Sequence, residues 1–137
     1  MASNSGEAAA PAVFKFSQID WDDPSKSSQP GKGPPEELVA KAKKSGAVRK
    51  KVVRGEGGFF MNRSSLPPGF RIPPHTHSHD ELIVILKGGC ELDGGLGELE
   101  ANDSIVLHAN YRYGFTCGSE GMEFLTIRIG EADTKAS

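Results

Sequence analysis

The sequence predicts an all-β domain, an antiparallel sandwich or small barrel of short strands, and three observations lead to this fold class. Glycine and proline account for 17 and 9 of the 137 residues, which is above ordinary usage and predicts frequent turns. From Ala47 onward, short apolar segments with the character of strands follow one another. Turn sequences such as GEGG, LPPG, KGG and CGSEG separate nearly all of these segments. Such punctuation is typical of antiparallel sheets.

The elements before the β-rich part are expected to be few. The first residues are small and polar, so they offer nothing to bury and are expected to be disordered. Val13–Phe16 predicts a short edge strand, and loop residues follow it. Glu36–Ser45 predicts a short helix, because acids lie in its first turn, lysines in its last, and Gly46 after it. The predicted organisation is a disordered tail over 1–12, an accessory strand, loop and helix over 13–46, a barrel over 47–130 and a tail over 131–137.

The β-rich part divides into nine predicted strands, each bounded by turn residues. These strands are Val48–Val53, Phe59–Ser64, Phe70–His77, Leu82–Leu86, Cys90–Leu92, Glu98–Glu100, Ser104–His108, Tyr111–Thr116 and Glu123–Ile129.

Composition argues against several classes of protein. The chain has 16 Lys and Arg against 18 Asp and Glu, a net charge of −2, whereas nucleic-acid-binding domains are usually clearly basic. No stretch reaches the roughly 18 apolar residues of a membrane helix. The first ten residues lack the features of a secretory signal, and the 2 cysteines fit no zinc motif or disulfide scaffold. We therefore expect a cytoplasmic protein without a nucleic-acid or membrane partner.

One segment departs from this even charge. Lys41–Arg54 carries seven basic residues and no acid. We expect a solvated helix end followed by an exposed strand edge, whose lysines prevent edge-to-edge aggregation. The alternative is an anion-binding or nucleic-acid surface, which the absence of interleaved aromatic residues disfavours.

The residues suited to chemistry gather in one short segment. His75, His77, His79 and Glu81, which include three of the 4 histidines, lie within seven residues. Alternate side chains of an extended chain share a face, so His75, His77 and Glu81 have the same parity, whereas the turn at His79 is expected to face outward. Two imidazoles and a carboxylate suit a divalent transition metal such as iron, manganese, nickel or zinc. The alternative is a histidine-rich surface turn or a set of hydrogen-bonded core histidines.

The spacing of this segment resembles the first motif of the cupin family. Gly69, five residues, His75, one residue, His77, three residues, Glu81, six residues and Gly88 match it at every defined position. The resemblance implies a double-stranded β-helix, a small jelly-roll barrel with one metal inside it. It also implies that His75, His77 and Glu81 are metal ligands.

The second cupin motif is where the chain departs from the family. That motif usually reads Gly-Asp, an apolar strand and Pro-x-Gly-x-x-His, with the last histidine as a further ligand. Aligning Asp103 and the following apolar strand places Asn102 at the first glycine and His108 at the proline. Tyr113 then occupies the position of the missing histidine.

Three interpretations of this departure stay open, beside a barrel with no functional metal. Tyr113 binds the metal or holds a metal-bound water, since a phenolate oxygen suits iron. Alternatively, Tyr113 does not bind, and a position is left open for substrate or water. In the third interpretation, a local bulge swings His108 inward as the replacement ligand.

The apolar residues around the cluster predict a pocket. All of Leu82–Leu86 is apolar, so both faces of this strand need cover. Ile83 and Ile85 share the parity of Glu81 and are expected to line the cavity. The other face is expected to be covered by the N-terminal segment or a second subunit, and the resemblance favours a homodimer.

Aromatic and charged residues near the chain end complete the predicted pocket. Tyr111, Tyr113 and Phe115 share one face and are expected to form an aromatic wall. Arg128 is expected to face solvent, and the alternative is that it orients an acidic substrate.

The resulting hypothesis is a metal-dependent enzyme that acts on a small organic molecule. Oxygenase (an oxidoreductase), lyase and isomerase types are all compatible with a metal that polarises substrate oxygen. Tyr113 is expected to act as a ligand or a general acid. The alternative function is a non-catalytic barrel that binds or senses a small molecule.

Overall fold

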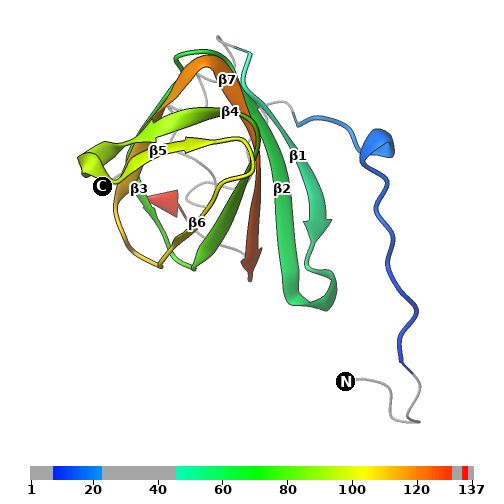
Figure 1. Cartoon of the computed structure of the whole chain (residues 1–137). Helices are drawn as coiled ribbons and strands as arrows, with labels where there is room; N and C mark the ends of the chain where they lie inside the picture. Colours follow the sequence, from blue (N-terminus) through cyan, green and yellow to red (C-terminus); the bar gives the residue numbers. More distant parts are fainter. Residues whose placement is uncertain (1–7, 23–45, 131–133, 136–137) are drawn as a thin grey trace.

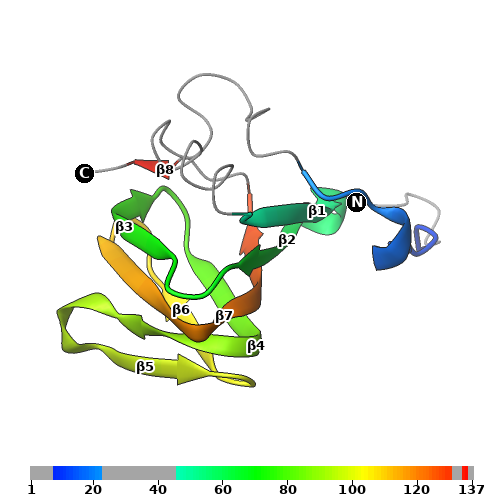
Figure 2. The same cartoon turned by 90° about the horizontal axis from the view of Figure 1, so that it is seen from above.

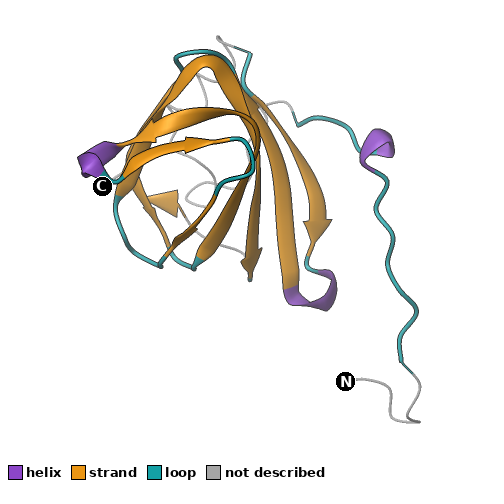
Figure 3. Cartoon of the chain, viewed as in Figure 1, coloured by secondary structure: helices purple, strands orange, loops and turns teal. Residues whose placement is uncertain are grey.

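The computed structural model describes residues 8–22, 46–130 and 134–135. These residues form an antiparallel β-barrel, so the predicted fold class is confirmed (Figures 1 and 3). The strands are β1 Val48–Arg54, β2 Phe59–Leu66, β3 Arg71–His77, β4 Glu81–Leu92, β5 Gly97–Glu100, β6 Ser104–Leu107, β7 Tyr113–Ile129 and β8 Thr134–Lys135. Short 3-10 turns are η1 Phe16–Gln18, η3 Glu56–Gly58 and η4 Asp93–Gly95.

Two long strands, β4 and β7, organise the barrel. One run of neighbours is β1-β2-β7-β3-β8, and β4 pairs with β5, β6 and β7. Every pair is antiparallel. Figure 2 shows the curvature from above, with the strands wrapping around a common interior. β1, β5, β6 and β8 each pair with one strand only, so they form the edges of the sheet.

Two predicted turns are instead bends within strands. The predicted strands on either side of the KGG sequence form the single strand β4, and those on either side of CGSEG form β7. Register shifts mark the bend in β4, where Gly88 has φ +69°. A Cβ on Gly88 would overlap the carbonyl oxygen of Gly121, so β4 approaches β7 this closely only because Gly88 has no side chain. A Cβ on Gly121 would instead overlap the carbonyl oxygen of Leu66 at the end of β2.

The N-terminal segment lies along the outside of β1 and β2 (Figure 1). The edge strand predicted over Val13–Phe16 is wrong, because Phe16 begins a 3-10 turn. The Phe16 ring meets Trp21 edge to face, with centroids 5.8 Å apart. Asp22 then makes one antiparallel bridge with Arg49 of β1. The predicted helix Glu36–Ser45 and most of the predicted disordered tail lie outside the described residues.

The aromatic pair covers a charged residue of the basic segment. Lys50 is buried, and its Nζ donates a 2.8 Å hydrogen bond to the carbonyl oxygen of Phe16. The same Nζ lies 3.7 Å from the ring centroid of Phe16 and 4.9 Å from that of Trp21. The prediction of an exposed edge is therefore wrong at Lys50, although Arg54 on the same strand is exposed. Lys50 ties the N-terminal segment to the barrel.

Replacing Lys50 by alanine is expected to lower the free energy of unfolding by about 2 kcal/mol, since a buried charge-assisted hydrogen bond and two cation–π contacts are lost. Urea unfolding followed by circular dichroism measures the change. Arg54→Ala is the matched control and is expected to stay within about 0.5 kcal/mol of the parent, because Arg54 lies exposed at the strand end. Equal stability of Lys50→Ala and the parent would contradict this account.

The inner and outer faces of β4 differ as the alternation predicted. Ile83 and Ile85 are buried in the core, at 6 % and 1 % exposure. On the outer face, Leu82 pairs with Val106 of β6, and these residues are 37 % and 57 % exposed. An apolar outer face is therefore present on two paired strands. Among the described residues, no helix has the length and apolar character needed to cross a bilayer.

Candidate metal centre

A bulge in β3 sets the orientation of the first histidine. Pairing between β3 and β7 is interrupted from Ile72 to His75, across two prolines that have no N–H to donate to a ladder. The carbonyl oxygen of Pro73 instead lies 2.8 Å from Nδ1 of His75. Because a carbonyl only accepts, Nδ1 carries the proton and Nε2 of His75 bears a lone pair.

Three possible metal-binding atoms lie close together on β3 and β7: Nε2 of His75, Nε2 of His77 and the hydroxyl oxygen of Tyr113. Nε2 of His75 lies 3.1 Å from Nε2 of His77. Tyr113 pairs directly with His75 across the two strands, and its hydroxyl lies 3.4 Å from Nε2 of His77. The ring centroids of His75 and Tyr113 are 4.6 Å apart. The structure thus brings together three of the four residues predicted to hold a metal.

The geometry of the two histidines fits one first-row transition metal. Metal–imidazole bonds are about 2.1 Å long. Two nitrogens 3.1 Å apart therefore subtend an angle of about 95° at an ion bound to both, which suits adjacent ligands. Neutral imidazoles and a phenol oxygen are donors that iron, manganese, nickel and zinc accept.

Glu81 is buried beside the histidines but faces a different atom. Its Oε2 lies 3.6 Å from Nδ1 of His77, the nitrogen turned away from His75. That distance is longer than a hydrogen bond, although it allows a strong electrostatic interaction. Within the part of the chain that the structure describes, no three His, Cys, Asp or Glu side chains form a metal-holding group. Glu81 is thus placed to orient His77 through Nδ1, as carboxylates do around many metal-bound histidines.

Burial controls the protonation of this cluster. It lowers the pKa of His75, and it lowers the pKa of His77 to about 4, with the charges of His75 and Arg128 adding to the effect. Burial also raises the pKa of Glu81 to about 7, against the opposing charge of Arg128. The pKa of Tyr113 is raised by burial first, and then by Glu81 and Cys90. At neutral pH both imidazoles are neutral, the state that binds metals, and the phenol keeps its proton.

The two other histidines near the motif do not join the cluster. The side chain of His108 is 81 % exposed, and its Nδ1 lies 3.8 Å from the carboxylate of Asp80. The interpretation in which a bulge swings His108 inward is therefore wrong. His79 contacts the hydroxyl of Ser78 at 2.9 Å and packs against Gly130.

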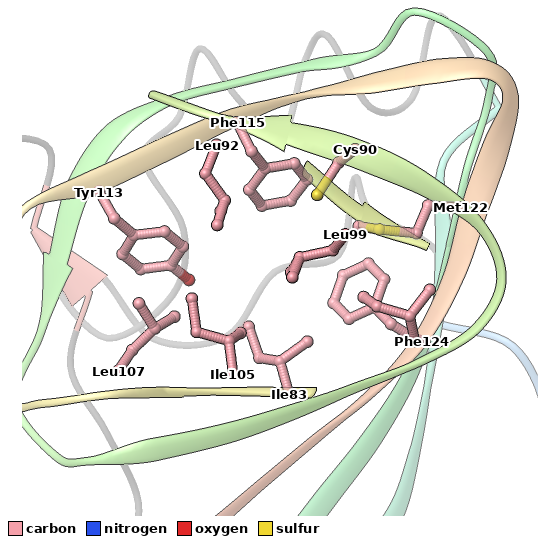
Figure 4. A pocket seen from close by; sticks show the side chains of 11 residues that line it. Ile83, Cys90, Leu92, Leu99, Ile105, Leu107, Tyr113, Phe115, Met122 and Phe124 are labelled. Carbon is pink, nitrogen blue, oxygen red and sulfur yellow. The ribbon is translucent and has the colours of Figure 1, made fainter. Parts of the chain in front are cut away.

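An apolar cavity lies behind Tyr113, which points into it (Figure 4). Its volume is about 10 Å³, close to the smallest space that holds one water molecule. Tyr111 is 51 % exposed and is not among the lining residues, so only Tyr113 and Phe115 of the three aromatic residues predicted to share this face line the cavity. The lining is completed by aliphatic, aromatic and sulfur-containing side chains: Ile83, Ile85, Cys90, Leu92, Leu99, Ile105, Leu107, Met122 and Phe124.

Arg128 was expected to face solvent, and the structure places it on the inner face of β7. It shares this face with Thr126 and Phe124, and Phe124 lines the cavity. Its Nε is buried and has no hydrogen-bond partner in the described residues. The sequence contains a signal for this position, because Arg128 lies four residues from Phe124 and alternate residues of a strand share a face. Its neighbour Ile129 is exposed and lies on the opposite face.

The profile of one protein family, described as Cupin domain, matches residues 62–128. This range includes both histidines, Glu81, Tyr113 and Arg128. No curated protein sequence matches the chain.

Several solved structures share the fold. The polyketide cyclase RemF from Streptomyces resistomycificus is 18 % identical, with a TM-score of 0.65 over 92 % of this chain and 84 % of that one. KdgF from Halomonas sp. is 18 % identical, with a TM-score of 0.62 over 88 % and 96 % of the two chains. An RmlC-like cupin from Shewanella frigidimarina is 16 % identical, with a TM-score of 0.60 over 88 % and 93 %. At such identities the likeness shows the fold alone.

Proposed function

Because the chain belongs to the cupin superfamily, we propose that it is a metal-dependent enzyme acting on a small organic molecule, of oxygenase, lyase or isomerase type. One observation carries the proposal. Nε2 of His77 lies 3.1 Å from Nε2 of His75 and 3.4 Å from the hydroxyl of Tyr113, which lines an apolar cavity. Unprotonated, buried imidazoles held this close together are poised to bind a cation.

The residues proposed to form the metal centre are His75, His77 and Tyr113 as ligands, with Glu81 as the carboxylate beside His77. The ion is iron, manganese, nickel or zinc, and when bound it supplies a Lewis acid that polarises a substrate oxygen. Glu81 contributes the negative charge of the centre from its place beside Nδ1 of His77. Pro73 contributes the acceptor that keeps Nε2 of His75 free of a proton.

The remaining chemistry belongs to Tyr113 and the cavity wall. The raised pKa of Tyr113 keeps its phenol protonated at neutral pH when no cation is bound, so the hydroxyl is a hydrogen-bond or proton donor. Phe115 stacks beside this ring, with centroids 6.4 Å apart. Together with the aliphatic lining, Phe115 excludes water from the inner side of the centre, which strengthens electrostatic interactions there.

A non-catalytic binding barrel is the second candidate. The cavity behind Tyr113, with a volume of about 10 Å³, admits no organic molecule, so a substrate or a ligand would have to bind outside this cavity. The exposed pair Leu82 and Val106 supports a homodimer, since apolar outer strands are a common interface between copies of a chain. Turnover of a metal-loaded sample separates the enzyme from the binding barrel.

The proposal is tested by elemental analysis of protein purified without added metal, stripped with a chelator and reloaded with each of the four ions. We expect about one ion per chain and a melting temperature raised by several degrees. Tyr113→Phe is expected to keep the fold and to weaken metal binding by at least about tenfold, because one donor oxygen is lost. With ferric iron, direct ligation by Tyr113 gives a visible charge-transfer band that this variant lacks.

Tyr111→Phe is the matched control, because it removes a phenol that lies 51 % exposed outside the cavity. Its metal content and stability are expected to equal those of the parent. A parent protein that retains none of the four ions, or a Tyr113→Phe variant that binds them as tightly as Tyr111→Phe, would contradict the proposal for these residues.

A further inference from the structure

The strand registers place Arg128 beside the candidate metal centre. Arg128 lies opposite Phe60 of β2, and its guanidinium carbon is 5.7 Å from the centroid of that ring. On the other side of β7, the pairing with β4 ends at Leu82 and Ile127, and continuing this register by one residue sets Glu81 opposite Arg128. Opposed residues of an antiparallel pair point to the same side. Arg128 therefore points to the inner side of the sheet, as Glu81 does.

The guanidinium of Arg128 lacks a partner for one of its buried donors. Its Nε is buried and makes no hydrogen bond within the described part of the chain. Leaving such a donor unpaired costs about 1–3 kcal/mol, and native structures rarely tolerate this without a reason. An acceptor from a bound molecule would supply the missing partner.

The surroundings of Arg128 are positively charged on the side of β1. The registers Arg49 with Ser64 and Lys51 with Asn62 put both basic side chains on the inner side of the sheet. The charge of Arg128 acts on Arg49 and, at the metal centre, on His77 and Glu81. These groups therefore share one electrostatic environment.

A single carboxylate already lies among the basic residues of β1. Asp22 lies 3.7 Å from Nε of Arg49 and 3.8 Å from Nζ of Lys51. One acid thus faces two cations there, and Arg128 has no ion pair with any acid of the described chain.

We propose that Arg128 is an anion subsite, which binds a carboxylate of the substrate while the reacting part of the molecule faces His75, His77 and Tyr113. The planar guanidinium offers two parallel donors that match the two oxygens of a carboxylate. The Phe60 ring lies beside this guanidinium, in cation–π contact with it. The substrate class is then a small organic acid. The inference deepens the proposed function and rests on that site being the place where substrate binds.

The test uses pyruvate as the probe and its neutral methyl ester as the matched ligand, with binding measured by calorimetry and by the NMR signal of the Arg128 Nε–H group. We expect pyruvate, but not methyl pyruvate, to shift that signal. Arg128→Met is expected to weaken pyruvate binding by at least about tenfold. Arg128→Lys is expected to weaken it by less, since lysine keeps the positive charge but lacks the two parallel N–H donors of a guanidinium. Lys87→Met, at an exposed position of β4, is the control for loss of a positive charge outside the site.

Two comparisons keep this inference separate from the metal proposal. The titrations are carried out with metal-loaded and with chelator-treated protein. If pyruvate shifts the Arg128 signal in both, the subsite holds even where the proposed metal function fails. If metal binds but Arg128→Met takes up pyruvate as the parent does, or the Nε–H signal of the parent does not move, the subsite is refuted and the metal site stands. Tighter binding of inorganic phosphate than of pyruvate overturns the carboxylate assignment.

Discussion

Replacing both His75 and His77 by alanine is expected to abolish stoichiometric metal binding by the folded protein. The two Nε2 atoms are 3.1 Å apart and supply both nitrogen donors of the proposed centre. Without them, Tyr113 and Glu81 are left, and neither holds a transition metal tightly by itself. An ion at 100 to 1,000 times its dissociation constant stabilises the folded state by about 3–4 kcal/mol, and the variant should lose this stabilisation entirely. Elemental analysis and denaturant unfolding with and without metal measure both effects.

The chain offers a matched control with the same number of histidines removed. His79 and His108 lie close in sequence or space to the motif, and they contact Ser78 and Asp80, respectively. A variant with alanine at both control positions is expected to bind metal as the parent does. If the variant without His75 and His77 retains one ion per chain, the proposed metal centre is refuted. If the control variant loses the metal, the metal site includes His79 or His108 instead.

The sequence predicts the fold class and the parity of the site because both depend on local patterns. Alternation along β3 places His75 and His77 on one face, and alternation along β4 buries Glu81 with Ile83 and Ile85. The Tyr113 position follows from counting residues along the second motif, and the structure brings its hydroxyl to 3.4 Å from His77. Period-two alternation suffices for these features, since each strand has one inner face.

Features that depend on distant segments escape the same reasoning. The glycines at 88 and 121 look like turn residues, and only the close approach of β4 and β7 shows that they are bends. Lys50 looks solvated, and the burial comes from Phe16, which is 34 residues away. The direction of the Glu81 carboxylate, toward Nδ1 of His77, is a side-chain rotation that strand parity leaves open.

The pH dependence of stability in the metal-free protein contains two opposing contributions from the site. Burial raises the pKa of Glu81 from 4.5 to about 7, so between these values the folded protein keeps a proton that the unfolded chain has released. Its contribution to stability is present below pH 4.5 and is lost as the pH rises through 7. His77 acts in the opposite direction, because its pKa falls from 6.5 to about 4 and its contribution is lost as the pH falls through that range. Between about pH 4.5 and pH 6.5, the contribution of Glu81 to stability falls as the pH rises, whereas that of His77 increases. The two contributions therefore partly cancel in the parent protein.

Glu81→Gln is expected to separate these contributions, because glutamine has the same shape and no proton to lose. In the presence of a chelator, the free energy of unfolding of Glu81→Gln relative to the parent should rise by about 2–3 kcal/mol between roughly pH 4.5 and pH 8, following the shift in pKa of Glu81. Urea unfolding at four or five pH values across this range measures the difference. Glu91→Gln, at an exposed position of the same strand, is the control and is expected to give a difference that stays constant within about 0.5 kcal/mol. A constant difference for Glu81→Gln as well would mean that Glu81 is ionised in the folded protein throughout this range, held by a cation close to it even without metal, and the candidate carrier of that charge is Arg128.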